Sequence, residues 1–139
     1  MIVSIHQPAY LPWIGYFNKI INSDIFVYLD TVQFQKNSFQ NRNKIRTSNG
    51  CIWLTIPVIT KKKLFSLQIK DLSIDNSQNW KKKHLNSIKM NYSKSLNYKS
   101  IMKDLEPFYI KEEDNFSKFC YEMLIWFLKK LNIKTKIIK

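Results

Sequence analysis

Residues 2–30, IVSIHQPAYLPWIGYFNKIINSDIFVYLD, contain two short apolar stretches separated by a helical pattern. The first stretch, 2–5, is typical of a buried strand and ends before Pro8. A helix is predicted to begin near Pro12, a residue suited to a first turn, and to run to about residue 21. The second stretch, 25–29, is continuous, which is typical of a strand buried on both faces. Together they predict a βαβ unit with a right-handed crossover and a parallel strand pair.

The segment after this unit is polar and amide-rich from residue 31 to residue 50. We predict a long loop there, and loops of that length in compact domains are usually functional or mobile. Residues 51–58 are expected to form a strand that Pro57 confines to an edge or an end. A further short strand is expected within 66–74.

The second half of the chain is predicted to be helical, with helices over 78–90, 98–105 and 116–131. An N-cap for the first is offered by 75–77, and the second is expected to stop before Pro107. The last helix carries an unbroken apolar stripe, which we interpret as core: Phe116, Phe119, Cys120, Met123, Leu124, Phe127, Leu128 and Leu131.

A final strand is predicted at 134–138, the last residues of the sequence. A strand at that position suggests that a further segment of chain once followed it. We therefore expect residues 1–139 to form one α/β domain. Its small parallel or mixed sheet would begin with the N-terminal βαβ unit, and its C-terminal half would be helical.

The composition limits the chemistry. With 45% hydrophobic and 14% aromatic residues the chain can build a core, and two glycines are too few for a Gly-rich phosphate loop. The two cysteines form no metal-binding or disulfide pattern, which suits a reducing compartment. Because no signal peptide and no run of roughly 20 apolar residues is present, we expect a cytoplasmic protein without a membrane span.

The formal charge of +13 would attract phosphate polymers or an anionic membrane surface. All but two of the 23 basic residues are lysine, however, as AT-rich codon usage would produce. The lysines are scattered apart from the runs at 61–63 and 81–83. We therefore expect a solvated basic surface, with nucleic acid an unlikely main partner.

The candidate site begins where the first predicted strand ends. His6 lies there, before a helix N-terminus, and ligands of open α/β sheets bind where strand ends and helix N-termini converge. His6 and Gln7 would contact an anionic or nucleotide-like ligand, with Tyr10 or Trp13 as a stacking wall. Alternatively, His6 only hydrogen-bonds the neighbouring backbone and shapes the turn.

Asp30 ends the second strand and should reach the same edge. Its carboxylate could orient a histidine, act as a base or hold Mg²⁺ through water, or it could merely cap the next turn. In the second half of the sequence, His84 lies one helical turn from Trp80. His84 either lines the same ligand cleft as His6 or belongs to the core. A His6, His84 and Asp30 metal site is conceivable, but no spacing predicts one, so we predict no metal.

The polar segment carries closely spaced hydrogen-bond donors at 40–44. These residues either clamp a ligand or form a solvated loop. Arginine reads carboxylate or phosphate with two parallel hydrogen bonds, so Arg42 stands out in a lysine-rich chain. The candidate ligand contacts of this segment are Gln33, Lys36, Gln40, Asn41, Arg42, Asn43 and Lys44.

The motif HQPAYLPWIGYF at 6–17 resembles the N-terminal signature of the WbqC-like family. The resemblance continues at 23–27, 29–30, 32–34, Lys36 and 40–45, and later at 53–55, 57–58, 75–80 and 83–85. It implies a bacterial protein encoded with surface-polysaccharide and O-antigen genes, acting as a transferase on an activated, nucleotide-linked sugar. The resemblance names no cofactor, so the cofactor stays unknown.

Two departures from the family pattern matter. Thr31 stands where the family often has a second aspartate, which weakens a two-carboxylate metal site. Family members also generally continue beyond the helix matching 115–131, so we expect this domain to be shortened relative to the family. It would then be a binding half or one subunit whose partner chain supplies the rest, and a non-catalytic binding module or a basic nucleic-acid-binding protein are the alternatives.

Overall fold

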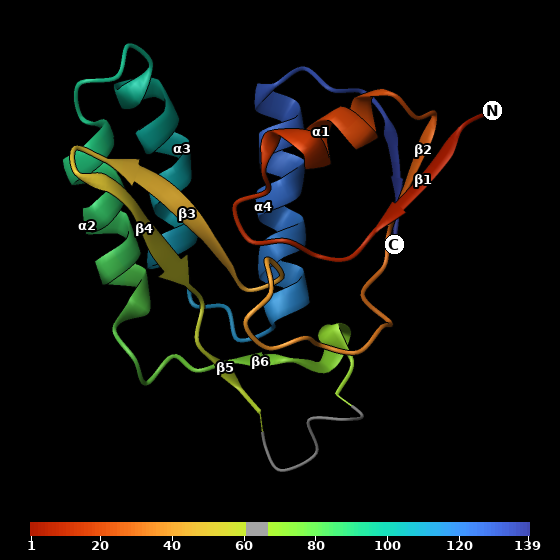
Figure 1. The fold of residues 1–139 in the computed structure, drawn as a ribbon, viewed down its shortest axis with the longest axis horizontal. Helices are drawn as coiled ribbons and strands as arrows, with labels where there is room; N and C mark the ends of the chain where they lie inside the picture. The colour runs from red at the N-terminus through yellow and green to blue at the C-terminus, as the bar shows by residue number, and fades with distance from the viewer. Residues whose placement is uncertain (61–66) are drawn as a thin grey trace.

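The computed structural model describes residues 1–60 and 67–139. Its main sheet has three parallel strands in the order β1-β2-β7, formed by β1 (Val3–His6), β2 (Ile25–Tyr28) and β7 (Lys136–Ile138). Helix α1 (Ile14–Ile21) connects β1 to β2, which confirms the βαβ unit, and the predicted last strand pairs with β2 (Figure 1).

One face of this sheet is packed and the other is open. Phe26 and Tyr28 of β2 are buried against α1 and against α4 (Phe116–Lys130). On the opposite face Val3 and Ile5 are 48% and 51% exposed, and their β2 neighbours are only partly buried. The expectation that the second strand is buried on both faces is therefore wrong, because the described helices lie on one side of the sheet (Figure 1).

A second lobe is built on the antiparallel hairpin of β3 (Arg42–Thr47) and β4 (Gly50–Thr55). The predicted loop over 31–50 is thus wrong in its last part. The sequence of β3 is polar because Ile45 is its only buried residue. Gly50, at φ 122°, supplies the positive φ that the tight turn between β3 and β4 requires. The sequence after β4 forms β5 (Val58–Ile59) beyond Pro57, in place of one strand over 51–58.

The segment predicted to hold a short strand contains a 3-10 helix, η2 (Ile69–Asp71), and then the two-residue strand β6 (Ser73–Ile74). Strand β6 pairs with β5 in antiparallel fashion. Ser66 of that prediction, and the lysine run at 61–63, lie outside the described residues.

Three helices form the back half, as predicted: α2 (Trp80–Tyr92), α3 (Tyr98–Ile110) and α4. The prediction that the second helix stops before Pro107 is wrong. Pro107 is exposed, and burial of Met102, Leu105 and Tyr109 on the inner face holds α3 together across the missing backbone hydrogen bond. Helix α2 takes Asn79 as its N-cap, and not 75–77.

Helix α4 lies between the two lobes and contributes to both cores (Figure 1). The side chain of Asn115 caps it by accepting from the Lys118 N–H at 2.8 Å. The predicted apolar stripe is core, except that Phe127 is only partly buried and Leu131 lies past the helix end, 53% exposed. No helix among the described residues is both long and apolar enough to cross a membrane.

Candidate functional site

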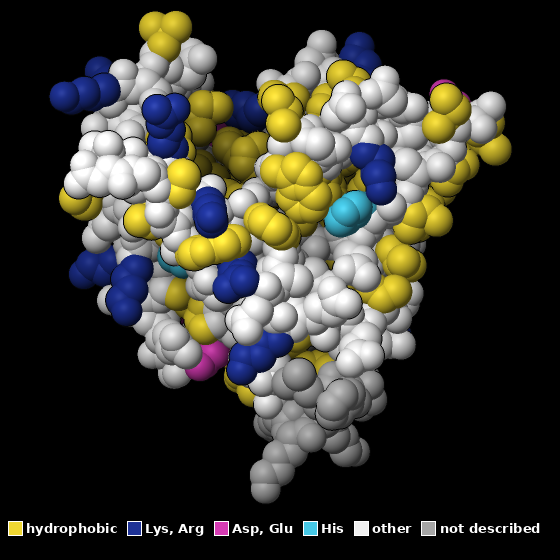
Figure 2. Space-filling view, in the orientation of Figure 1, with side chains coloured by type: hydrophobic (Ala, Val, Ile, Leu, Met, Phe, Trp, Pro, Cys, Tyr) yellow, Lys and Arg dark blue, Asp and Glu magenta, His cyan; other side chains and the backbone are white. Residues whose placement is uncertain are grey.

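Four ring-bearing side chains form a continuous row on the surface, here called the aromatic row: His6, Trp13, Phe39 and Trp53. Successive ring centroids lie 5.6, 5.6 and 5.7 Å apart. Trp13, Phe39 and Trp53 are 39%, 50% and 42% exposed. Figure 2 shows hydrophobic side chains gathered beside a histidine on this face. Contiguous exposed aromatic surface on a small domain marks a binding site.

Three separate parts of the fold supply the row. His6 ends β1 and Trp13 is the N-cap residue of α1, so the βαβ unit places both at the carboxyl edge of the parallel sheet. Trp53 comes from β4 of the hairpin, and Phe39 lies in the loop between the two lobes. The row therefore crosses from the parallel sheet to the hairpin.

Two cations flank the Trp53 end of the row. The Arg42 guanidinium lies 4.4 Å from the Trp53 ring centroid, and Lys44, which is paired with Trp53 across the hairpin, places Nζ 4.9 Å from it. Neither cation forms an ion pair within the described part of the chain. Their charge is therefore available to an anionic ligand on the row.

The tautomer of His6 follows from its hydrogen bond. Its Nδ1 lies 2.9 Å from the carbonyl oxygen of Gln7, which can only accept, so in the neutral imidazole Nδ1 carries the proton. This leaves Nε2 as the nitrogen with the lone pair. Edge-on contacts with Trp13 and Tyr16 hold the ring. His6 can thus act as a hydrogen-bond acceptor or general base at one end of the row.

Gln40 fixes the loop that carries Phe39. Its Nε2 donates to Gln7 Oε1 at 2.5 Å, its Oε1 accepts from the Gln35 N–H at 2.9 Å, and its carbonyl accepts from the Tyr10 N–H at 2.9 Å. These bonds tie the loop to the segment that follows β1. Gln40 and Gln7 are therefore positioning residues for the row.

The other predicted residues of this segment divide by role. Asn41 donates to the carbonyl of Ile56 at 2.9 Å and Asn43 to that of Leu11 at 2.5 Å, so both hold backbone in place. Of residues 40–44, Arg42 and Lys44 are the two whose cationic groups lie over a ring of the row. Two buried atoms of this segment, Asn41 Oδ1 and Arg42 Nε, have no hydrogen-bond partner among the described residues.

Tyr10 and His84 lie in the core and not on the row. Tyr10 has no exposed surface, and its hydroxyl lies 2.9 Å from His84 Nδ1 and 2.6 Å from the Tyr109 hydroxyl. Burial lowers the pKa of His84 to about 4, partly opposed by a hydrogen bond with the Thr55 backbone. His84 also packs edge-on against Trp80. We therefore leave Tyr10 and His84 out of the ligand site.

Asp30 is held by partners other than His6. The residue is 5% exposed, and its carboxylate accepts from the Ser117 hydroxyl at 2.5 Å and pairs with Lys139 at 3.2 Å. It thus joins the end of β2 to α4 and the end of the chain, and it does not orient the imidazole. Gln33 forms a β-bridge with Gln68, and Lys36 is exposed.

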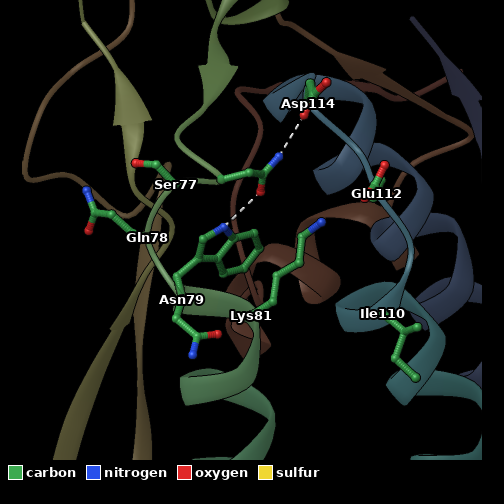
Figure 3. Close-up of a pocket in the computed structure, with 9 residues that line it drawn as sticks. Ser77, Gln78, Asn79, Lys81, Ile110, Glu112 and Asp114 are labelled. Carbon is green, nitrogen blue, oxygen red and sulfur yellow. Dashed lines mark hydrogen bonds between the residues drawn. The ribbon is translucent and has the colours of Figure 1, made fainter.

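A separate polar hollow of about 570 Å³ lies at the start of α2 (Figure 3). Its groups bond one another: Asn76 donates to Asp114 at 2.7 Å and accepts from Trp80 Nε1 at 3.2 Å. Lys81 donates to the carbonyl of Lys111, and burial lowers its pKa against the opposing effect of nearby carboxylates. None of the predicted site residues lines this hollow, so the aromatic row is the better candidate.

Phe39 and Trp53 were not among the residues predicted for the site. The available signal for Phe39 is that it is an aromatic residue within a polar, amide-rich segment. Trp53 was assigned only to a strand, and its exposure depends on the hairpin register, which pairs it with Lys44. That register was not predicted because β3 was not.

Gly15, which has no side chain, leaves room for the Trp13 ring. A Cβ at residue 15 would lie 3.0 Å from Trp13 Nε1 and 3.2 Å from Cδ1, so Gly15→Ala should push the half-exposed indole out of the row. Because alanine raises helix propensity by up to about 1 kcal/mol, the unfolding free energy should change little. Urea unfolding together with Trp13 indole N–H shifts checks this, and an unmoved indole would contradict it.

The sequence matches the family model of the WbqC-like protein family over residues 7–139. It is similar to the uncharacterized protein Rv1507c of Mycobacterium tuberculosis (strain ATCC 25618 / H37Rv), with 35% identity over 136 residues. That match covers 97% of this chain and 58% of the relative, so the chain spans little more than half of the relative's length. No solved structure matches the chain. Because the family model covers nearly every residue, the chain belongs to the WbqC-like protein family.

Proposed function

We propose that the protein binds a nucleotide-linked sugar on the aromatic row and takes part in its transfer during surface-polysaccharide synthesis. The observation that carries the proposal is the row itself, with two cations at one end that form no ion pair with any described residue. Aromatic faces stack on nucleobases and on the apolar faces of sugar rings. Arginine and lysine bind diphosphate oxygens through charge-assisted hydrogen bonds.

In this proposal the ligand lies along the row in one direction. The diphosphate would lie toward Arg42 and Lys44, and the group to be transferred toward His6. His6 Nε2 would take the proton from the acceptor hydroxyl or amine as its oxygen or nitrogen bonds to the anomeric carbon. The bond from that carbon to the diphosphate oxygen breaks, and the leaving nucleoside diphosphate keeps the electron pair near the two cations.

Lys44→Ala tests the diphosphate end of this site. We expect affinity for nucleoside-diphosphate sugars to fall roughly tenfold, since a charge-assisted contact is lost, while the weak binding of the free sugar stays unchanged. Titration calorimetry at two salt concentrations measures this. Lys99→Ala, which removes an exposed lysine of α3 outside the row, is the matched control. Equal losses in both variants, or no binding by the unaltered protein, would overturn the proposal.

A second candidate is a binding module without turnover, since the aromatic row and its two cations can hold a ligand without a catalytic step. It predicts the same binding but no product when nucleoside-diphosphate sugar and acceptor are incubated together. The aromatic row and the charge of +13 would also suit single-stranded nucleic acid. Binding of oligonucleotides alone, with a steep salt dependence, would favour that function and exclude the sugar.

A further inference from the structure

An apolar cavity of about 350 Å³ lies between the hairpin, helices α2 and α3, and α4. Its walls include Ile45 of β3, Ile88 of α2, Met102 and Leu105 of α3, and Phe127 of α4. Figure 2 shows a hollow lined with hydrophobic side chains between the two lobes. The volume is within the range of small-ligand sites, and such apolar walls favour a hydrocarbon chain over water.

A polar hollow of about 440 Å³ adjoins this cavity and shares Tyr92 and Ser95 with it. Arg46 and Lys94 line the polar hollow, and no acidic residue does. Within residues 1–60 and 67–139 neither cation forms an ion pair. The backbone N–H of Arg46 donates to the Tyr92 hydroxyl at 3.1 Å, which fixes the boundary between the two hollows. Positive charge that has no ion-pair partner among the described residues therefore lies beside an apolar cavity.

We propose that the two hollows together bind one anionic amphiphile. Its hydrocarbon chain fills the cavity beside Met102, and its phosphate or carboxylate head is held by Arg46 and Lys94. A neutral apolar ligand would leave the two cations without a role, and an inorganic anion would leave the apolar walls in water. Because neither hollow is lined by a residue of the aromatic row, this site is separate from the proposed sugar site.

The first test uses the unaltered protein, its methionine methyl groups labelled with ¹³C, and dodecyl phosphate kept below micelle formation. The Met102 methyl lines the apolar cavity and should shift most, and Met90, at the polar hollow, should respond less. Met1, at the chain end, and Met123, buried in the core, should stay in place. An unmoved Met102, or an equal shift of Met1, overturns the proposal.

The second test separates head from chain. Replacing both cations with alanine, in Arg46→Ala with Lys94→Ala, should weaken dodecyl phosphate by roughly tenfold or more and leave dodecanol unchanged. Ile101→Trp, at a half-buried wall position, should weaken both, whereas Lys99→Ala should weaken neither. Inorganic phosphate alone should not bind measurably. Binding of anionic vesicles without monomeric dodecyl phosphate would instead indicate a membrane surface and overturn the site.

Discussion

The free energy of unfolding should fall by about 3 kcal/mol as the pH is lowered from 6.5 to 4, because of His84. In the folded state burial lowers the pKa of His84 to about 4, and in the unfolded chain this pKa returns to its ordinary value of 6.5. Between these values the unfolded state binds a proton that the folded state does not. The stabilisation is thus complete above pH 6.5 and is lost as the pH falls toward 4.

Urea unfolding across this interval measures the effect, and His84→Gln isolates it. The glutamine cannot titrate but can still accept from the Tyr10 hydroxyl, so we expect lower stability overall with a flatter dependence on pH. Carboxylates also titrate near pH 4, which is why the comparison is between variants. Parallel curves for His84→Gln and the unaltered protein would contradict this assignment.

Trp13→Ala and Trp53→Ala should each weaken nucleoside-diphosphate sugar binding about ten- to hundredfold, as expected for a lost stacking contact of roughly 1–3 kcal/mol. Both side chains are about two-fifths exposed, so their removal should cost little stability. Ile14→Ala, next to Trp13 and 88% exposed, should bind normally and serves as the control. Calorimetric titration decides, and undiminished affinity in both tryptophan variants would remove the row from the site.

The elements that could be predicted are those whose pattern is short-range. Residues 2–30 and the stripe of α4 each bury a continuous apolar face, so their periodicity gives the element directly. Strand β3 was not predicted because Ile45 is its only buried residue, so the strand has no alternating apolar pattern. The predicted helix end before Pro107 is wrong because packing of α3 against the core outweighs the low helix propensity of proline.

The candidate site was predictable only where topology alone determines position. His6 and Trp13 lie together because a βαβ unit brings a strand end to a helix start. Tyr10 and His84 are 74 residues apart, and nothing local indicates their buried hydrogen bond. Asp30 lies two residues past β2, which ends at Tyr28 and not at Asp30 as predicted. Its carboxylate is held by Ser117 on α4, whose placement no sequence pattern provided.

The central claim, that the aromatic row binds a nucleotide-linked sugar, is tested most directly by the four indole N–H signals. In an ¹⁵N-labelled sample titrated with a nucleoside-diphosphate hexose, Trp13 and Trp53 on the row should shift together. Trp80, buried in the core, and Trp126, whose Nε1 is buried, should not move. Saturable shifts of Trp13 and Trp53 alone are the predicted result. Four unmoved signals, or shifts confined to Trp80 and Trp126, would contradict the account.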